Sequence, residues 1–531
     1  MRSSRIIYDG KNVKLSAPVP TMNQPSFEPT VADVDEGPTK RIKARSNSRA
    51  AVLLAVVFAC LCIVLTLGSG QSRVGDAADY TAMAWQFSHL RPPALTVADE
   101  AELDRHYHEL GNRMPSFEAS TYMVPALERN GRFEQLHFWI YPLMVSPASV
   151  VVHALNLPDT YAFAAFNILL ASLVLFIVAR RLGVAAAALL FVSPLLWWVD
   201  KPHAEVLMFC AILLALLWRR ERPLWGMLCL ALAAANNVTF LGVFVVYAIA
   251  AAIEHRRALY DSRKKIAALC GIGFLAVLHP LYYKIRLGVI DPIAAISDGG
   301  MRVPTVTRFV TPLVDPFNGL VVWWPMLVLV AVVGGVIRAW RRSLEPRTLR
   351  EWVFVWTPFV LACAVLFAQA QVGAPESGGT FSMCRYALWL APFAVYGLDH
   401  KRTFQNRVAP KALLSVTVAA SAVLSVHVAR PSLPDSWFTV HPPFVAAVLS
   451  DHAPWAWNSP PYIFMVRQWR TFTTTGPVAN PTCTKLLAVS GVWPTTCPAP
   501  VNVPSACASS PYCYANRSGD RYGFVPVKDK G

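Results

Sequence analysis

Residues 51–69 read AVLLAVVFACLCIVLTLGS, an apolar run without a charged side chain. As an α-helix this run spans about 30 Å, the thickness of the hydrocarbon core of a bilayer. It follows about fifty polar residues, too many for the charged region that precedes the apolar core of a cleaved signal peptide. The run therefore predicts an uncleaved first membrane helix.

The composition of the whole chain agrees with a membrane protein. Of the 531 residues 55% are hydrophobic and 15% are charged, and the mean hydropathy is +0.40. These values exclude disordered, collagenous and small disulfide-scaffold proteins. We expect an all-α polytopic membrane protein with about eleven transmembrane helices. After the first run, apolar segments occur at 161–179, 183–199, 204–218, 223–234, 238–253, 266–283, 319–337, 353–371, 386–398 and 412–428.

The basic residues predict which side of the membrane each loop faces. We interpret the apolar stretch 137–155 as a re-entrant or interfacial helix on the outer face. If it crossed the membrane, every later basic cluster would lie on the side opposite to the basic N-terminal tail. With that choice, 28 of the 48 Lys and Arg fall in the loops on the side of the N-terminal tail. The positive-inside rule then predicts a cytoplasmic N-terminus and an extracytoplasmic C-terminus. We expect the membrane to be a bacterial inner (cytoplasmic) membrane.

The same reasoning divides the chain into three parts. Residues 1–50 lack apolar periodicity and predict a flexible cytoplasmic tail, and residues 51–428 form the transmembrane module. Residues 429–531 predict a loop-rich extracytoplasmic appendage. The outer loops of the module are 70–160, 284–318 and 372–385.

The C-terminal appendage contains four cysteines, Cys483, Cys497, Cys507 and Cys513. Because cysteines on the outer side of a membrane are usually oxidised, these four predict two disulfides. Four cysteines allow three pairings, and the sequence alone does not choose among them.

The first outer loop opens with GDAADYTAMAWQF at 75–87, directly after the first predicted span. Asp76 and Asp79 are three residues apart, so in a helix both carboxylates project from one face. A carboxylate at the membrane surface can act as a catalytic base, and Asp76 can equally cap a helix that starts near Ala77. The loop is acidic overall, with eleven Asp and Glu from Asp76 to Asp159 against six Arg.

Basic residues in later outer segments are candidates to bind a phosphate. Arg302 and Arg308 lie in the loop 284–318, and Arg385 precedes Tyr386 at the start of an apolar segment. A guanidinium at that position needs water or an anion as a partner. A lipid phosphate or an ordinary headgroup satisfies this need equally well.

Two histidine-containing motifs are weaker signals. His203 and Glu205 are placed to contact a substrate at the outer mouth of a span, but such a pair more often caps and anchors a helix. The run from His106 to Glu109 lacks the His pair, four residues apart, of a zinc protease, so it predicts a solvated loop face. We therefore expect no metal site.

Taken together, these features resemble the GT-C superfamily of polytopic glycosyltransferases, which includes protein mannosyltransferases and aminoarabinose transferases. The resemblance covers roughly residues 50–400. It is carried by four motifs, namely Gly75-Asp76 with Asp79-Tyr80, HFWIYPLMVSP (137–147), DPFNGLVVWWPML (315–327) and GGTFSMCRYALWLAP (378–392).

The resemblance implies an enzyme that moves a sugar from a polyprenyl-phosphate-linked donor to a hydroxyl of a glycan, lipid or protein acceptor. It implies no cofactor and no nucleic-acid partner. Asp76 matches the presumed base, Asp79 a second acidic position, and Arg385 with Tyr386 a phosphate-binding pair. Two alternatives remain open, a transporter or flippase of an envelope glycolipid and a non-catalytic assembly scaffold. A transporter would bury charges at mid-membrane, and the predicted spans are nearly free of charge.

Overall fold

The computed structural model describes residues 38–68, 77–110, 125–293, 306–315, 319–343, 348–370 and 384–398, two single residues (419 and 423) and, with gaps, 478–527. The chain divides into two compact units, residues 1–46 and 47–531. The first unit is described only from residue 38 onward, where a helix begins.

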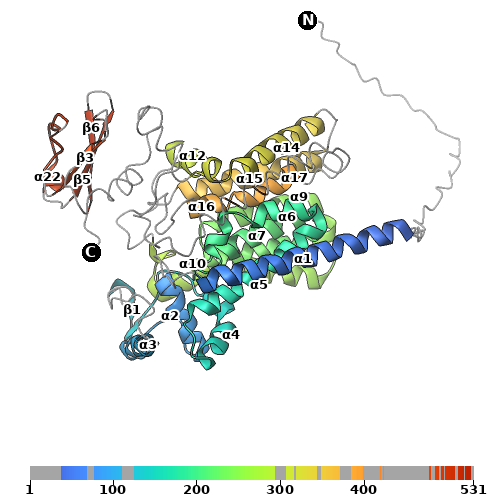
Figure 1. The fold of residues 1–531 in the computed structure, drawn as a ribbon, viewed down its shortest axis with the longest axis horizontal. Coiled ribbons are helices and arrows are strands. Elements are labelled where there is room, and N and C mark those ends of the chain that lie inside the picture. Colours follow the sequence, from blue (N-terminus) through green and yellow to red (C-terminus); the bar gives the residue numbers. More distant parts are fainter. Residues whose placement is uncertain are drawn as a thin grey trace, which may run out of the picture. The chain divides into compact units, whose positions relative to one another are not determined.

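The described part of the chain is mostly helical (Figure 1). The helices before the predicted 284–318 loop are α1 (Pro38–Gly68), α2 (Ala77–Ser88), α3 (Val97–Glu109), α4 (Ile140–Ala154), α5 (Thr160–Leu182), α6 (Val184–Phe191), α7 (Glu205–Trp218), α8 (Pro223–Asn236), α9 (Phe240–Leu259) and α10 (Arg263–Leu287). The later helices are α12 (Val306–Val314), α13 (Leu320–Trp323), α14 (Pro325–Ser343), α15 (Leu349–Ala370), α16 (Arg385–Leu388), α17 (Val395–Leu398) and α22 (Ser505–Ala508). Short 3-10 helices are η2 (Pro125–Leu127), η3 (Pro194–Trp198) and η4 (Ala391–Ala394).

Three helices of the described residues are long and apolar enough to cross a membrane. They are Ser48–Gly68 of α1, α5 and α10, and shorter apolar helices include α4, α7 and α8. The expected count of about eleven spans is not reached within these residues. One expected span, 183–199, is broken into α6 and η3 by Pro194, and another, 386–398, is broken into α16, η4 and α17 around Pro392.

The N-terminal tail also differs from its prediction. Helix α1 already begins at Pro38, so residues 38–50 are helical although they were expected to belong to a flexible tail. This stretch carries Lys40, Arg41 and Lys43 and no acidic residue. The helix therefore continues the apolar span into a basic segment, because helix formation propagates readily once a long stable helix is present.

The helices α7, α8, α9 and α10 pack against one another in a compact group (Figure 1). Gly226 of α8 lets α9 approach closely, since a Cβ at this position would lie 2.0 Å from the hydroxyl oxygen of Tyr247. That hydroxyl donates a hydrogen bond to the carbonyl oxygen of Ala215 on α7, 3.0 Å away. Gly226 of α8 therefore leaves room for the Tyr247 side chain of α9, which hydrogen-bonds to α7.

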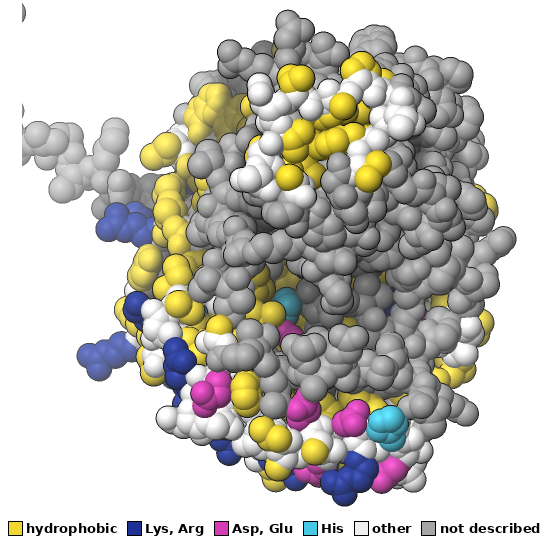
Figure 2. Space-filling view, turned by 90° about the vertical axis from the view of Figure 1, so that its left-hand side faces the viewer, with side chains coloured by type: hydrophobic (Ala, Val, Ile, Leu, Met, Phe, Trp, Pro, Cys, Tyr) yellow, Lys and Arg dark blue, Asp and Glu magenta, His cyan; other side chains and the backbone are white. Residues whose placement is uncertain are grey.

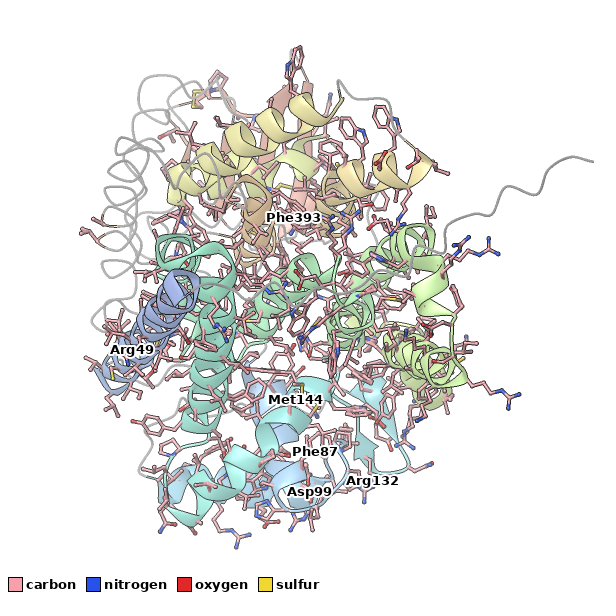
Figure 3. The ribbon with its side chains drawn as sticks, turned by 90° about the vertical axis from the view of Figure 1, so that its right-hand side faces the viewer. Arg49, Phe87, Asp99, Arg132, Met144 and Phe393 are labelled. Atoms are coloured by element: carbon pink, nitrogen blue, oxygen red, sulfur yellow. A yellow bond between two sulfur atoms is a disulfide. The ribbon has the colours of Figure 1, made fainter. Side chains whose placement is uncertain are left out.

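A second group is formed by α2, α3 and α4, labelled at the lower end of Figure 1. Thr96 caps α3, and Thr96 and Asp99 exchange hydrogen bonds in a capping box. A short antiparallel hairpin of β1 (Glu128–Arg129) and β2 (Arg132–Phe133) lies beside it, and Leu95 bridges to Phe133. In Figure 3 the labels Phe87, Asp99 and Arg132 mark this group, while Phe393 marks η4.

The expected interfacial stretch 137–155 forms helix α4, which packs between α2 and α5. Two contacts fix the direction of α2 relative to α4. Asp79 at the start of α2 meets His137 just before α4, and Ser88 at the end of α2 meets His153 near the end of α4. The two helices therefore run parallel, and each pair of ends forms its own cluster of polar side chains.

The C-terminal part is not all-α. Strands β3 (Val478–Ala479), β4 (Lys485–Val489), β5 (Tyr512–Ser518) and β6 (Arg521–Val527) form an antiparallel sheet in that order. Disulfides join Cys483 to Cys497 and Cys507 to Cys513, one of the three pairings left open by the sequence. The expected loop-rich appendage thus contains a sheet, in which Leu486 and Ala488 of β4 and Cys513 and Ala515 of β5 are buried.

Candidate active site

A pocket forms where several helix ends meet. Its wall includes the N-terminal ends of α7 and α16, the C-terminal end of α8, part of α10 and the loop before α4. The polar side chains among the lining residues are Tyr80, His137, Glu205, Asn236, Asn237, His279, Asp291, Arg385 and Tyr386. Helix ends and loops bring unlike polar groups together, whereas the flanks of the same helices are apolar.

One wall of the pocket carries an aspartate–histidine pair. Asp79, in the first turn of α2, lies 2.8 Å through its Oδ2 from Nδ1 of His137. The two side chains are only 7% and 17% exposed. Because Nδ1 faces the carboxylate, Nε2 is the ring nitrogen on the opposite edge of the imidazole. A histidine held in this way has a set tautomer and orientation.

Aromatic rings surround the histidine. Tyr80 lies with its ring centre 5.2 Å from that of His137 and 5.5 Å from that of Tyr141. Tyr80 lines the pocket, and Tyr141 is fully buried behind it and donates a hydrogen bond to Asn167. These rings restrict the motion of the imidazole and reduce its contact with water.

The guanidinium of Arg385 stands in the same pocket. Its Nε lies 3.6 Å from Oε1 of Glu205, and its side chain is 13% exposed. The guanidinium also lies over the ring of Tyr386, 5.2 Å from the ring centre. An arginine in this position has a counter-charge nearby, yet its lining position gives it access to an anion.

Glu205 begins helix α7 and does not cap it by a hydrogen bond. His203 lies 3.8 Å from the second carboxylate oxygen of Glu205 and is almost fully buried, with Trp198 beside it. Glu205 lies in the first turn of α7, so the expected role of the pair as a helix cap and anchor stays a prediction. The carboxylate of Glu205 faces Arg385 across the mouth of the pocket, while His203 packs behind it.

Asn236 adds a neutral polar group to the wall. It ends helix α8 and is 6% exposed, and its Oδ1 has no hydrogen-bond partner among the described residues. A buried carbonyl oxygen without a donor costs about 1–3 kcal/mol. A hydroxyl group of a bound ligand would supply that donor.

The structure brings together some of the sequence-predicted site residues. Asp79 reaches the pocket through His137, and Glu205, Arg385 and Tyr386 line it. Arg308 belongs to α12, which packs against α16, but it does not line the pocket. Asp76 and Arg302 lie outside the described residues. Helix α2 is described from Ala77 onward, so the alternative that Asp76 caps it stays a prediction.

Sequence reasoning missed His137, Asn236, His279 and Asp291 as pocket residues. His137 opens the HFWIYPLMVSP stretch, so a polar residue directly before an apolar outer helix was the available signal. His279 lies within the expected span 266–283, where the surrounding apolar residues obscure its place in the wall.

The other ends of α2 and α4 carry a second polar cluster. His106, His153 and Asp159 each offer a ligand atom, and these atoms all lie within 4.8 Å of one another. The prediction of a solvated loop face for the run from His106 to Glu109 is wrong in part. These residues are helical, and Tyr107 is buried because its face of α3 packs toward α2 and α5.

Charged side chains gather on the surface near α3. Figure 2 shows acidic, basic and histidine side chains at the lower end of the displayed face, and hydrophobic side chains along its left edge. Arg91 pairs with Asp99 at 3.1 Å and with Glu102 at 2.6 Å. The acidic surplus of this loop is thus partly neutralised by its own arginines.

Comparison of the chain with protein-family models, with curated proteins and with solved structures finds no match. The functional argument therefore rests on the pocket and on the order of motifs along the chain.

Proposed function

We propose that this chain is a polytopic membrane glycosyltransferase with a GT-C-like transmembrane module. It transfers a sugar from a polyprenyl-phosphate-linked donor to an acceptor hydroxyl on the extracytoplasmic side. One observation carries the proposal, namely that a carboxylate-held histidine and an arginine line the same pocket at the ends of apolar helices.

The base in this proposal is His137. Hydrogen-bonding to Asp79 orients the imidazole and stabilises the imidazolium that forms when Nε2 takes a proton. Positioned proton transfer of this kind contributes about 10²–10⁴-fold in rate. Asp79 is then a positioning residue, and Asp76 is the alternative base predicted from the sequence.

Arg385 is the group that receives the leaving phosphate. As the glycosidic bond breaks, negative charge develops on the polyprenyl phosphate, and a guanidinium binds phosphate oxygens with two parallel hydrogen bonds. Glu205, 3.6 Å away, balances the guanidinium before the donor arrives. Asn236 offers a free carbonyl oxygen to a sugar hydroxyl.

The reaction is a single displacement. The acceptor oxygen forms a bond to the anomeric carbon as its proton passes to His137, and the bond from that carbon to the phosphate oxygen breaks with its electron pair. One direct displacement inverts the anomeric centre. No cofactor takes part in the proposed step, because the carrier phosphate is already a good leaving group.

The membrane supports the choice of donor. The pocket is lined in part by the candidate span α10 and by the shorter apolar helices α7 and α8. A polyprenyl chain dissolves in the same hydrocarbon layer and delivers its phosphate at the surface, where the helix ends lie. The proposal takes the pocket end as extracytoplasmic, in accordance with the distribution of Lys and Arg.

The test is the release of free polyprenyl phosphate by the purified chain in lipid nanodiscs. The donors are a panel of polyprenyl-phosphate-linked monosaccharides, so one product reports on every sugar. We expect His137→Gln and Asp79→Asn to lower the rate about 10²–10⁴-fold. Asp104→Asn is the matched control, because Asp104 is exposed on α3 and lies away from the pocket.

Two outcomes would contradict the proposal. Release at the wild-type rate by His137→Gln and Asp76→Asn together would remove both candidate bases. The chain can also be reconstituted in liposomes of the same lipid composition as the nanodiscs. Movement of intact donor across the liposome membrane, without release of polyprenyl phosphate, would favour the flippase alternative. Release of polyprenyl phosphate without transfer of the sugar to any hydroxyl acceptor would identify hydrolysis by water. The variants His137→Gln and Asp76→Asn would then test which residue is the base of that hydrolysis.

A further inference from the structure

The second polar cluster lies at the C-terminal ends of α2 and α4. It comprises His106 of α3, His153 of α4 and Asp159, which immediately precedes α5. Along α2 it is roughly 13 Å from Asp79, at a rise of about 1.5 Å per residue. The cluster is therefore separate from the pocket and independent of the function proposed for it.

We propose that these three side chains bind a divalent transition-metal ion, and that zinc fits them best. Two imidazoles and one carboxylate form a common zinc ligand set. Hard ions such as Mg²⁺ and Ca²⁺ prefer oxygen ligands alone. The three protein ligands leave a fourth position for water or for His89, whose ring centre lies 5.7 Å from that of His153.

The spacing of the ligand atoms suits a small ion. All three lie within 4.8 Å of one another, and Nε2 of His153 already contacts Oδ1 of Asp159. Tetrahedral ligands with bonds of about 2.0 Å lie about 3.3 Å apart. Side-chain rotations that shift the ligand atoms by about 1 Å therefore bring them to zinc-binding distance without moving the helices.

Neighbouring residues orient two of the ligands. Oγ of Ser88 lies 3.2 Å from Nδ1 of His153, on the side of the ring opposite Asp159. The hydroxyl of Tyr107 donates to Oδ2 of Asp159 at 3.0 Å, which leaves Oδ1 directed at the cluster. Metal-binding histidines and carboxylates characteristically have such outer hydrogen bonds, which fix the tautomer and the direction of the ligand atom.

The third ligand has an unmet need for a partner. Nε2 of His106 is buried and has no hydrogen-bond partner among the described residues. The ring of Trp85 lies against the rings of His89, His106 and His153, with centre distances of 4.2, 4.4 and 4.8 Å. This indole shields the cluster from water, so a bound ion is the partner that the geometry offers to His106.

The ion would join four helices. Its ligands come from α3, α4 and the start of α5, and Ser88 of α2 supports one of them. The same α2 and α4 hold Asp79 against His137 at their other ends. The metal is thus a structural clamp that stabilises the α2–α4 pair without touching the reacting atoms.

The test uses the full chain purified in detergent, stripped with a chelator, loaded with zinc sulfate and desalted. We expect about one equivalent of zinc per chain by mass spectrometry, and a tetrahedral visible spectrum when Co²⁺ replaces zinc. His106→Gln and Asp159→Asn should each weaken zinc binding at least tenfold. The matched control is His108→Gln, since His108 is 61% exposed two residues further along α3 and should retain wild-type binding.

A conservative variant serves as a control against misfolding. Tyr107→Phe keeps all three ligands and removes only the hydrogen bond to Asp159, so it should weaken zinc binding about 10–100-fold while the chain remains folded. The proposal is overturned if the wild-type chain retains no zinc, or if His106→Gln and Tyr107→Phe bind zinc as tightly as His108→Gln.

Discussion

The two ends of helices α7 and α8 differ in their chemistry. At one end, Glu205 and Asn236 line a pocket with His137 and Arg385, so acid, base, amide and guanidinium meet. At the other end a cavity is lined by basic and apolar residues, namely Phe176, Ile177, Arg180, Arg181, Trp218 and Arg222. This second cavity is larger, about 340 Å³ against about 80 Å³, but none of its described lining residues can accept a proton.

The charges at the arginine end are used to hold the helices. Arg181 donates to the carbonyl oxygen of Leu217 at 2.8 Å and to Glu221 at 2.6 Å. Beside this cavity, Arg219 is buried, pairs with Glu254 of α9, and donates to the carbonyl oxygen of Val353 on α15 at 3.2 Å. The comparison teaches that the larger cavity is not the one that gathers unlike polar groups, and that the arginine pairs at the arginine end are shorter than the 3.6 Å contact of Arg385 with Glu205.

The largest expected effect is a loss of stability at the arginine end of α7 and α8. Arg219→Gln leaves Glu254 without its buried counter-charge, and breaking such a pair costs about 3–5 kcal/mol. We expect the thermal unfolding temperature in detergent to fall sharply, whereas Arg220→Gln at the exposed neighbouring position should leave it unchanged. Equal melting of the two variants would contradict a structural role for the Arg219–Glu254 pair.

The next effect concerns the pocket end. Arg385→Gln removes the side chain proposed to donate hydrogen bonds to the leaving phosphate. Loss of one such transition-state contact lowers kcat about 10²–10³-fold. We expect the release of polyprenyl phosphate per folded chain to slow by that factor, and the unfolding temperature to fall as well, because the buried Glu205 loses its counter-charge. Arg222→Gln, at the arginine end, is the control and should retain the wild-type rate. A slow Arg222→Gln and a fast Arg385→Gln would reverse the assignment of the two ends.

The smallest effect comes from an exposed ion pair between Arg91, which follows α2, and Glu102 of α3. The hydrogen bond from Arg91 lowers the pKa of Glu102 below its ordinary value of 4.5. Because the folded pKa is depressed, the stabilisation is complete above that ordinary value and is lost as the pH falls through the lower folded value. Arg91→Gln should therefore cost less than about 1 kcal/mol at neutral pH and nothing at pH 2.

Unfolding temperatures measured from pH 2 to pH 7 check this last prediction. Arg129→Gln, an exposed arginine of the β1–β2 hairpin, serves as the control. A difference between Arg91→Gln and the wild type that persists unchanged at pH 2 would show that Arg91 acts through packing and not through its charge.

Local features of the fold were predictable. The apolar runs at 161–179 and 266–283 became α5 and α10. Interruptions were less predictable, because Pro194 and Pro392 break helices in a way that depends on the neighbouring helices. The C-terminal sheet was missed, since β4 and β5 pair across the proline-rich segment 490–511, and the two-residue connection between β5 and β6 was not recognised as a hairpin.

The candidate site was only partly predictable for the same reason. Asp79, Glu205 and Arg385 stand out because an ionisable residue beside an apolar span is costly unless it has a role. His137 is 58 residues from Asp79, and no periodicity connects them. The pairing arises because α2 and α4 pack parallel and bring their N-terminal ends together.

By itself, the sequence determined that the chain is mostly helical and that several helices are apolar enough for a membrane, because the length and composition of an apolar run are local properties. Only the tertiary structure decided that Asp79 meets His137, that His106 joins His153 and Asp159, and that Cys483 pairs with Cys497. The physical reason is that contacts between distant residues depend on how whole helices and strands pack, and this packing sums many weak interactions along the entire chain.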